Sequence, residues 1–160
     1  MSNEIYEFMR NVEMQAMSII EEGYKPQGRP YECLFQLLYL PSFEKVESWE
    51  MFKQNNNYFI VLSYWNKDED LKKLEIPHVD LKLRYNKLSV EPTIVSKRKE
   101  ITEDFANEIL NILGTLKISP LPEGCPFGCD GVSFKMKFGG LFHGIKIEWW
   151  CDGPENWRDF

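Results

Sequence analysis

Residues 129–160, CDGVSFKMKFGGLFHGIKIEWWCDGPENWRDF, predict a β-hairpin followed by an aromatic tail. Apolar and polar residues alternate over 132–138 and again over 145–149. A period of two is typical of strands that bury one face. Three glycines lie within 139–144, which suits a hairpin loop longer than a two-residue turn. Asp130-Gly131 is a turn signal before the first strand. We therefore expect a turn there, followed by two paired strands and the loop that joins them.

The adjacent residues Trp149 and Trp150 must point to opposite faces of the hairpin. If Trp149 is part of the core, Trp150 lies on the other face and must be shielded from solvent by another residue. Trp157 in the tail is the candidate for this role. We interpret these rings mainly as packing residues. A ligand-binding aromatic platform and a contact with a partner protein are the alternatives.

The totals predict one domain spanning residues 1–160 with a core large enough to be stable without disulfides or metal. Hydrophobic residues make up 43% of the 160 residues, and the net charge is −6. This acidity argues against nucleic-acid binding and against an anionic membrane surface. It is compatible with a basic protein partner.

The N-terminal sequence MSNEIYEFMR is polar and acidic, unlike an export signal. No apolar run approaches the roughly 18 residues that a membrane span requires. We therefore expect a cytoplasmic protein whose four cysteines are reduced.

Upstream of the hairpin, the patterning predicts two helices. The first spans 3–22 and ends at Gly23. Its expected buried stripe is Ile5, Met9, Val12, Ala16 and Ile19. The second spans 103–113, with Thr102 as N-cap and Gly114 as its stop. Its expected buried residues are Phe105, Ile109, Ile112 and Leu113.

Several strands are expected between these helices. They cover 31–40, for which a short helix is the alternative, the amphipathic stretch around Trp49 and Met51, 58–65 after an Asn55–Asn57 turn, 80–85, and an edge strand at 88–95. We expect residues 67–73 to form a solvated charged loop or helical turn. The only basic run, Lys97-Arg98-Lys99, precedes Glu100, Glu103 and Asp104, so we expect its field to be offset locally.

The resulting fold prediction is a single α+β domain. It consists of an N-terminal helix, an antiparallel sheet of about five meander strands, a second helix and the C-terminal β-hairpin, and the two helices are expected to cover one face of the sheet.

No stretch spells out a catalytic motif, which favours a protein that is not an enzyme and uses no cofactor. The alternative with the most definite chemistry is zinc bound by soft ligands. Those candidate ligands are Cys125, Cys129, His143 and Cys151. The other interpretation is that Cys129 and Cys151 are small buried residues at the two ends of the hairpin.

Acidic residues gather around the C-terminal tryptophans, and Leu141-Phe142 marks the hairpin loop. Such a surface suits a basic protein, and the alternative is a small-molecule or carbohydrate site, including that of a hydrolase. An exposed phenylalanine in the loop would indicate a partner contact. The candidate partner-binding residues are Phe142, Trp150, Asp152, Glu155 and Trp157.

The order Asp130-Gly131, Phe134, a glycine loop, Trp149-Trp150, Pro154 and Trp157 resembles the end of many small bacterial proteins of uncharacterised or immunity type. Several such proteins neutralise toxins encoded next to them. The resemblance implies a cytoplasmic immunity protein that occludes a toxin, and the acidity favours a basic toxin.

Overall fold

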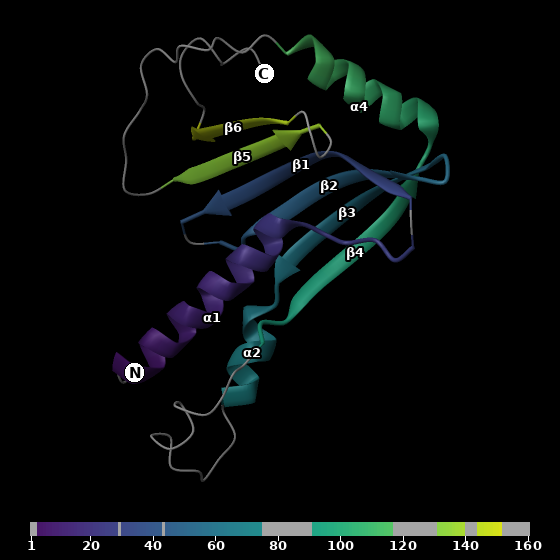
Figure 1. Ribbon diagram of the computed structural model, residues 1–160. Helices are drawn as coiled ribbons and strands as arrows, with labels where there is room; N and C mark the ends of the chain where they lie inside the picture. The colour runs from purple at the N-terminus through teal and green to yellow at the C-terminus, as the bar shows by residue number, and fades with distance from the viewer. Residues whose placement is uncertain are drawn as a thin grey trace.

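One antiparallel sheet organises the computed structural model, whose described residues are 3–28, 30–42, 44–74, 91–116, 131–139 and 144–151. Within these residues the sheet has six strands in the order β4-β3-β2-β1-β5-β6. The elements are α1 (Asn3–Glu22), β1 (Tyr31–Pro41), β2 (Glu47–Gln54), β3 (Asn57–Trp65), α2 (Lys67–Leu74), β4 (Ile94–Ile101), α4 (Glu103–Thr115), β5 (Val132–Phe138) and β6 (Ile145–Trp150). The α+β prediction is confirmed (Figure 1).

The sheet grows outward from a meander of β1, β2 and β3. Asn55 and Asn56 form the β2–β3 turn with φ values of 50° and 67°, which suits a two-residue hairpin whose central residues are both left-handed. β4 then pairs with β3, and the C-terminal hairpin pairs through β5 with the other side of β1. The predicted hairpin is confirmed, with Phe138 opposite Ile145.

Helix α1 packs on one face of the sheet, which we call the α1 face, and lies in front of the strands in Figure 1. Val12, Ala16 and Ile20 form its buried stripe against Leu38 and Trp65. The predicted stripe was therefore wrong at its end, since Ile19 is 44% exposed. The positions that reach the sheet follow a strict i, i+4, i+8 spacing, and Ile19 lies beside that line.

Helix α4 packs on the opposite face, the α4 face. Its Ala106 is completely buried beside Met51 and Tyr58, and Thr102 accepts a hydrogen bond from the Phe105 N–H, which confirms the predicted cap. The expectation that both helices cover one face was wrong. The chain leaves β4 at Ile101, which points to the α4 face with Tyr58, and α4 begins two residues later.

Two details of α4 also differ from the sequence prediction. Phe105 and Ile112, which we expected to be buried, are 47% and 57% exposed. The helix also continues to Thr115, so Gly114 lies inside its last turn rather than at its end.

Strands β2 and β4 differ from their predicted patterns. In β2, Met51 is fully buried but Trp49 is 39% exposed, whereas Ser48 and Glu50 are buried on the α1 face. The strand predicted at 88–95 instead begins at Ile94 and continues through the basic run to Ile101. The predicted strand at 80–85 lies outside the described residues.

Helix α2 occupies the stretch predicted as a solvated charged loop or helical turn, so the helical alternative is confirmed. Its Asp70 is only 1% exposed, although it belongs to a strongly acidic run. The carboxylate accepts hydrogen bonds from Trp65 Nε1 at 2.7 Å and from the Thr93 N–H at 2.8 Å. Asp70 therefore joins α2 to the end of β3 and to the segment that enters β4.

Candidate functional site

The α4 face carries two neighbouring rows of side chains that are not buried by α1, α2 or α4. Alternation along the strands and the registers between them place these residues on one face. We call them the open patch. Its first row is Lys97, Leu62, Trp49, Leu37, Met136 and Ile147, and its second row is Val95, Tyr64, Glu47, Tyr39, Phe134 and Trp149.

None of the open-patch residues is buried, although ten of the twelve are apolar or aromatic. Trp49 near the centre is 39% exposed. The α1 face behaves differently over the same central strands, where Leu38, Ser48 and Val61 are at most 1% exposed. Helix α4 covers only the end of its face around Met51. The open patch is thus the part of the sheet that none of the described helices covers.

The size of the open patch can be estimated from sheet geometry. Strands lie about 4.8 Å apart and same-face residues about 6.7 Å apart, so each residue occupies roughly 32 Å² and the two rows roughly 400 Å². Contiguous apolar patches of about this size on a protein surface commonly mark binding sites.

Aromatic stacking orders one end of the open patch. Phe134 stacks on Trp149 with ring centroids 5.2 Å apart and an interplanar angle of 16°. Tyr39 follows with its centroid 5.7 Å from that of Phe134. The Tyr39 hydroxyl donates a hydrogen bond to Glu44, which raises the pKa of this phenol. Three rings from three adjacent strands therefore present a continuous aromatic surface.

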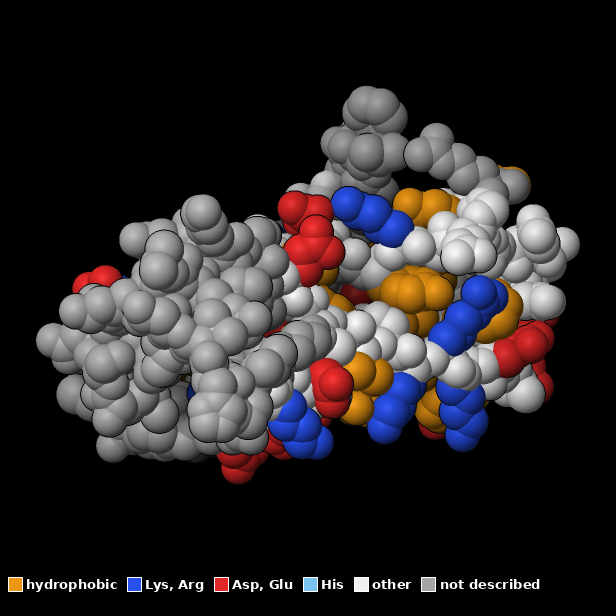
Figure 2. Space-filling model, turned by 90° about the horizontal axis from the view of Figure 1, so that it is seen from below, with side chains coloured by type: hydrophobic (Ala, Val, Ile, Leu, Met, Phe, Trp, Pro, Cys, Tyr) orange, Lys and Arg blue, Asp and Glu red, His pale blue; other side chains and the backbone are white. Residues whose placement is uncertain are grey.

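The other end of the open patch is basic. Lys97 and Lys45 both approach the Tyr64 ring, with Nζ atoms 5.5 Å and 5.4 Å from its centroid. Lys99 lies one row away on the same face. Lysine and arginine side chains stand among hydrophobic ones in the right half of Figure 2.

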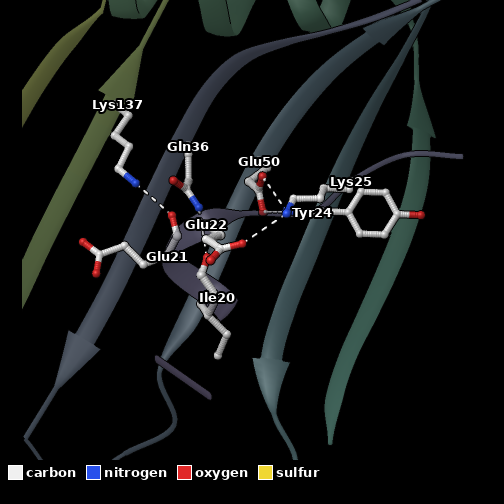
Figure 3. A network of polar contacts seen from close by, with 8 residues as sticks. All are labelled: Ile20, Glu21, Glu22, Tyr24, Lys25, Gln36, Glu50 and Lys137. Atoms are coloured by element: carbon white, nitrogen blue, oxygen red, sulfur yellow. Dashed lines mark hydrogen bonds and ion pairs between the residues drawn. The ribbon is translucent and has the colours of Figure 1, made fainter. Parts of the chain in front are cut away.

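A buried polar network on the α1 face fixes α1 to the sheet (Figure 3). Gln36 Nε2 donates to the Ile20 carbonyl at 3.1 Å, and Lys137 Nζ donates to the Glu21 carbonyl at 2.8 Å. The last carbonyls of a helix need such partners, and a cation there also suits the helix dipole. Glu50 accepts the Tyr24 N–H just beyond the helix end. These polar groups therefore anchor α1.

Burial raises the pKa of the Glu50 carboxyl, and the hydrogen bonds from the Tyr24 N–H and Ser48 only partly oppose that effect. The Cys33 thiol on the same face is also perturbed, since burial and the nearby Glu50 charge raise its pKa to about 12. A thiol with such a pKa is protonated at neutral pH and is a poor nucleophile. Neither perturbed group adjoins the open patch.

Of the five candidate partner-binding residues, only Trp150 lies in the described part of the chain. It is half-buried on the α1 face, because its strand partner Ser133 follows the alternation of that face. The opposite orientations predicted for Trp149 and Trp150 are confirmed. Phe142, Asp152, Glu155 and Trp157 lie outside the described residues.

The proposed zinc ligands are described only at Cys151, whose backbone N–H donates to the Val132 carbonyl at 2.7 Å. Cys125, Cys129 and His143 lie outside the described residues, so zinc binding stays a prediction. In the part of the chain that is described, no three His, Cys, Asp or Glu side chains converge as metal ligands would.

A small cavity of about 140 Å³ lies away from the open patch, between α1 and the strands β3 and β4. It is lined by Ile19, Ile20, Gly23, Tyr24, Ser63, Ile94 and Ser96. Pockets for drug-sized ligands usually measure about 300–1,000 Å³.

None of the described helices combines the length and apolar composition needed to cross a bilayer.

Comparison of the chain with protein-family models, with curated proteins and with solved structures gives no match.

The open patch itself was missed by the sequence analysis. Its signal was the apolar character of both faces of residues 31–40 and 58–65. That pattern indicates cover on two sides, and it does not distinguish a helix of the same chain from a partner.

Proposed function

We propose that this chain is a non-enzymatic protein-binding domain that engages its partner through the open patch. The observation that carries the proposal is a surface of roughly 400 Å² in which ten apolar or aromatic side chains from six strands remain unburied. Tyrosine and tryptophan are enriched where protein interfaces concentrate their binding energy. The open patch holds two of each.

The polar chemistry elsewhere in the described residues supports binding over catalysis. Glu50 and Asp70 are the acidic side chains buried there, and their carboxylates accept hydrogen bonds from backbone N–H groups that hold elements together. The Cys33 thiol is held in its protonated form by its raised pKa. These groups serve the fold, and among the described residues we assign function to the open patch.

The form of this function that we propose is a cytoplasmic immunity protein that occludes a bacterial toxin. The resemblance of the C-terminal hairpin supports it, and the net charge of −6 would draw a basic toxin toward the chain. Much of that charge lies in residues 3–22, which contain five glutamates and one arginine. Because α1 lies on the other face of the sheet, this charge would attract a basic partner at long range, while contact occurs on the open patch.

The test uses the product of the neighbouring gene, co-expressed with the chain in a bacterial host. We expect the chain to bind that product and restore growth. Trp49→Asp should weaken binding at least 10-fold, since central tryptophans often contribute about 2 kcal/mol or more. Met14→Asp is the matched control, because Met14 is 54% exposed on α1 and lies outside the open patch.

The open patch as the interface and the immunity role can be refuted independently. If the pair binds but Trp49→Asp has no more effect than Met14→Asp, the open patch is not the interface. If the neighbouring product neither binds nor harms the host, the immunity role is wrong. Thermal unfolding of both variants establishes that they are folded.

A further inference from the structure

The basic run of β4 is divided between the two faces of the sheet. Arg98 points to the α1 face, where its guanidinium lies 3.5 Å from the centroid of the Phe59 ring and donates to Gln54 Oε1 at 3.3 Å. Lys97 and Lys99 point to the α4 face. Glu100, which we expected to offset this run, shares the α1 face with Arg98, so strand alternation separates it from the two lysines.

Within the described part of the chain, Lys97 and Lys45 have an aromatic neighbour but no carboxylate partner. Both ammonium groups lie about equally far from the Tyr64 centroid, at 5.5 Å and 5.4 Å. The ion pairs among the described residues are Lys25–Glu22, Lys135–Glu21, Lys135–Glu148 and Lys146–Glu148. Both cations therefore lie against one ring without a carboxylate partner among the described residues, so an anionic group of a partner would be attracted to them.

This pair of lysines is continuous with the open patch. Tyr64 and Lys97 belong to its two rows, and the first row continues from Lys97 through Leu62 to Trp49. An anionic group held at the lysines would therefore have apolar side chains beside it. Glu47, which follows Tyr64 in the second row, accepts a hydrogen bond from Trp49 Nε1 at 3.2 Å.

We infer that the partner presents an Asp or Glu side chain next to apolar residues, and that Lys45 and Lys97 bind its carboxylate at the β4 end of the open patch. This inference rests on the proposed function and adds the chemistry of the partner's docking segment. It is compatible with a partner of basic net charge, since net charge governs approach whereas a local pair fixes register.

A protein segment fits this surface better than a nucleic acid does. The rows contain five aliphatic side chains, which cannot form ion pairs or hydrogen bonds with a phosphate backbone. They are Leu37, Leu62, Val95, Met136 and Ile147. Glu47 lies among them and would repel phosphates, as would the net charge of −6.

The test selects a random peptide library, displayed on phage, against the intact chain. We expect the selected peptides to be enriched in Asp or Glu flanked by apolar residues. A synthetic copy of one such peptide should bind the Lys45→Glu, Lys97→Glu double variant at least about 5-fold more weakly, in keeping with two exposed charge pairs. Lys25→Glu is the control, because the described partner of Lys25 is the exposed Glu22, near the α1 face.

Each other outcome of the peptide selection would refute a specific part of this inference or of the proposed function. Apolar peptides without acidic enrichment, bound through Trp49, would refute the inference but keep the open patch as a protein-binding surface. Selected peptides that bind equally well to the double variant would also refute it. A failure to select any peptide that depends on Trp49 would refute both. Tighter binding of a twelve-nucleotide uridine RNA than of the peptides, lost in the double variant, would identify a nucleic-acid ligand instead.

Discussion

The Glu50 carboxylate of β2 accepts the backbone N–H of Tyr24 at 2.9 Å, two residues beyond the end of α1. This bond holds a carboxylate that is only 2% exposed and directs the chain away from the helix. Gln36 and Lys137 satisfy the preceding carbonyls, so three strands contribute to one helix end. The attachment of α1 consequently depends on an acid whose ionisation is opposed by its surroundings.

Glu50 should make stability depend on pH. Burial raises the pKa of its carboxyl above the usual 4.5, so the folded chain binds this proton more tightly than the unfolded chain. Its contribution is complete below the unfolded pKa and is lost as pH rises through the folded pKa. We expect the free energy of unfolding of the wild type, relative to Glu50→Gln, to decrease between about pH 4 and pH 8. Urea unfolding across that range measures it.

Glu148→Gln provides a control of opposite sign. A hydrogen bond from Lys146 lowers the pKa of Glu148, so its contribution is present above the unfolded pKa and is lost as pH falls. The effect should be small, since this pair is about half exposed. Identical pH profiles for the wild type and Glu50→Gln would contradict the prediction.

Gly23→Ala should destabilise the chain by about 1–3 kcal/mol. Gly23 has φ +90°, and an added Cβ would lie 2.7 Å from Oε2 of Glu50. Gly114→Ala is the matched control, because Gly114 lies inside α4 with nothing within 4 Å of its added Cβ. That change should stabilise the chain by about 0.5–1 kcal/mol. Chemical denaturation compares the two, and equal effects would count against our account of the α1 end.

Asp70→Asn should cost about 2–4 kcal/mol of stability. Trp65 Nε1, the Thr93 N–H and the Thr93 hydroxyl all donate to this carboxylate, and a carboxamide has one acceptor oxygen fewer. Asp68→Asn changes the same charge at an exposed position of α2 and should stay within about 0.5 kcal/mol of the wild type. Comparable thermal midpoints for the two variants would refute a structural role for Asp70.

Gly131→Ala should displace the Trp150 indole. An added Cβ would lie 2.5 Å from Cζ2 of Trp150 and 2.7 Å from Sγ of Cys151. We expect a loss of about 1–3 kcal/mol, as for other overpacked positions, and a shift in tryptophan emission. Adding Trp150→Phe should restore part of the stability, because the smaller ring leaves room for the methyl group. An additive double variant would show that the two residues do not press on each other.

Local signals in the sequence were sufficient for most elements. Period-two alternation identified β5 and β6, and the glycines between them identified the connecting loop. Thr102 predicted the start of α4 because a cap needs only its neighbours. Such features involve residues close together in the chain.

The errors occurred where distant residues decide the outcome. Ser48 and Glu50 gave β2 a polar face, and that face is buried because Gln36 and Tyr24 supply partners from other elements. The basic run concealed β4, since three consecutive charges hide the alternation of a strand at the end of the described sheet. The open patch depends on which face α4 covers, which no single stretch encodes.

The division of the basic run in β4 also bears on self-association. β4 ends the described sheet, and its residues from Ser96 to Glu100 are exposed. If two copies paired antiparallel along this strand about Arg98, Lys97 of one copy would oppose Lys99 of the other, and the two arginines would oppose each other. Like charges directly across a ladder are destabilising, and natural proteins use lysine on edges in this way. Lys97, to which we assign the partner's carboxylate, would therefore also disfavour edge-to-edge pairing of two sheets.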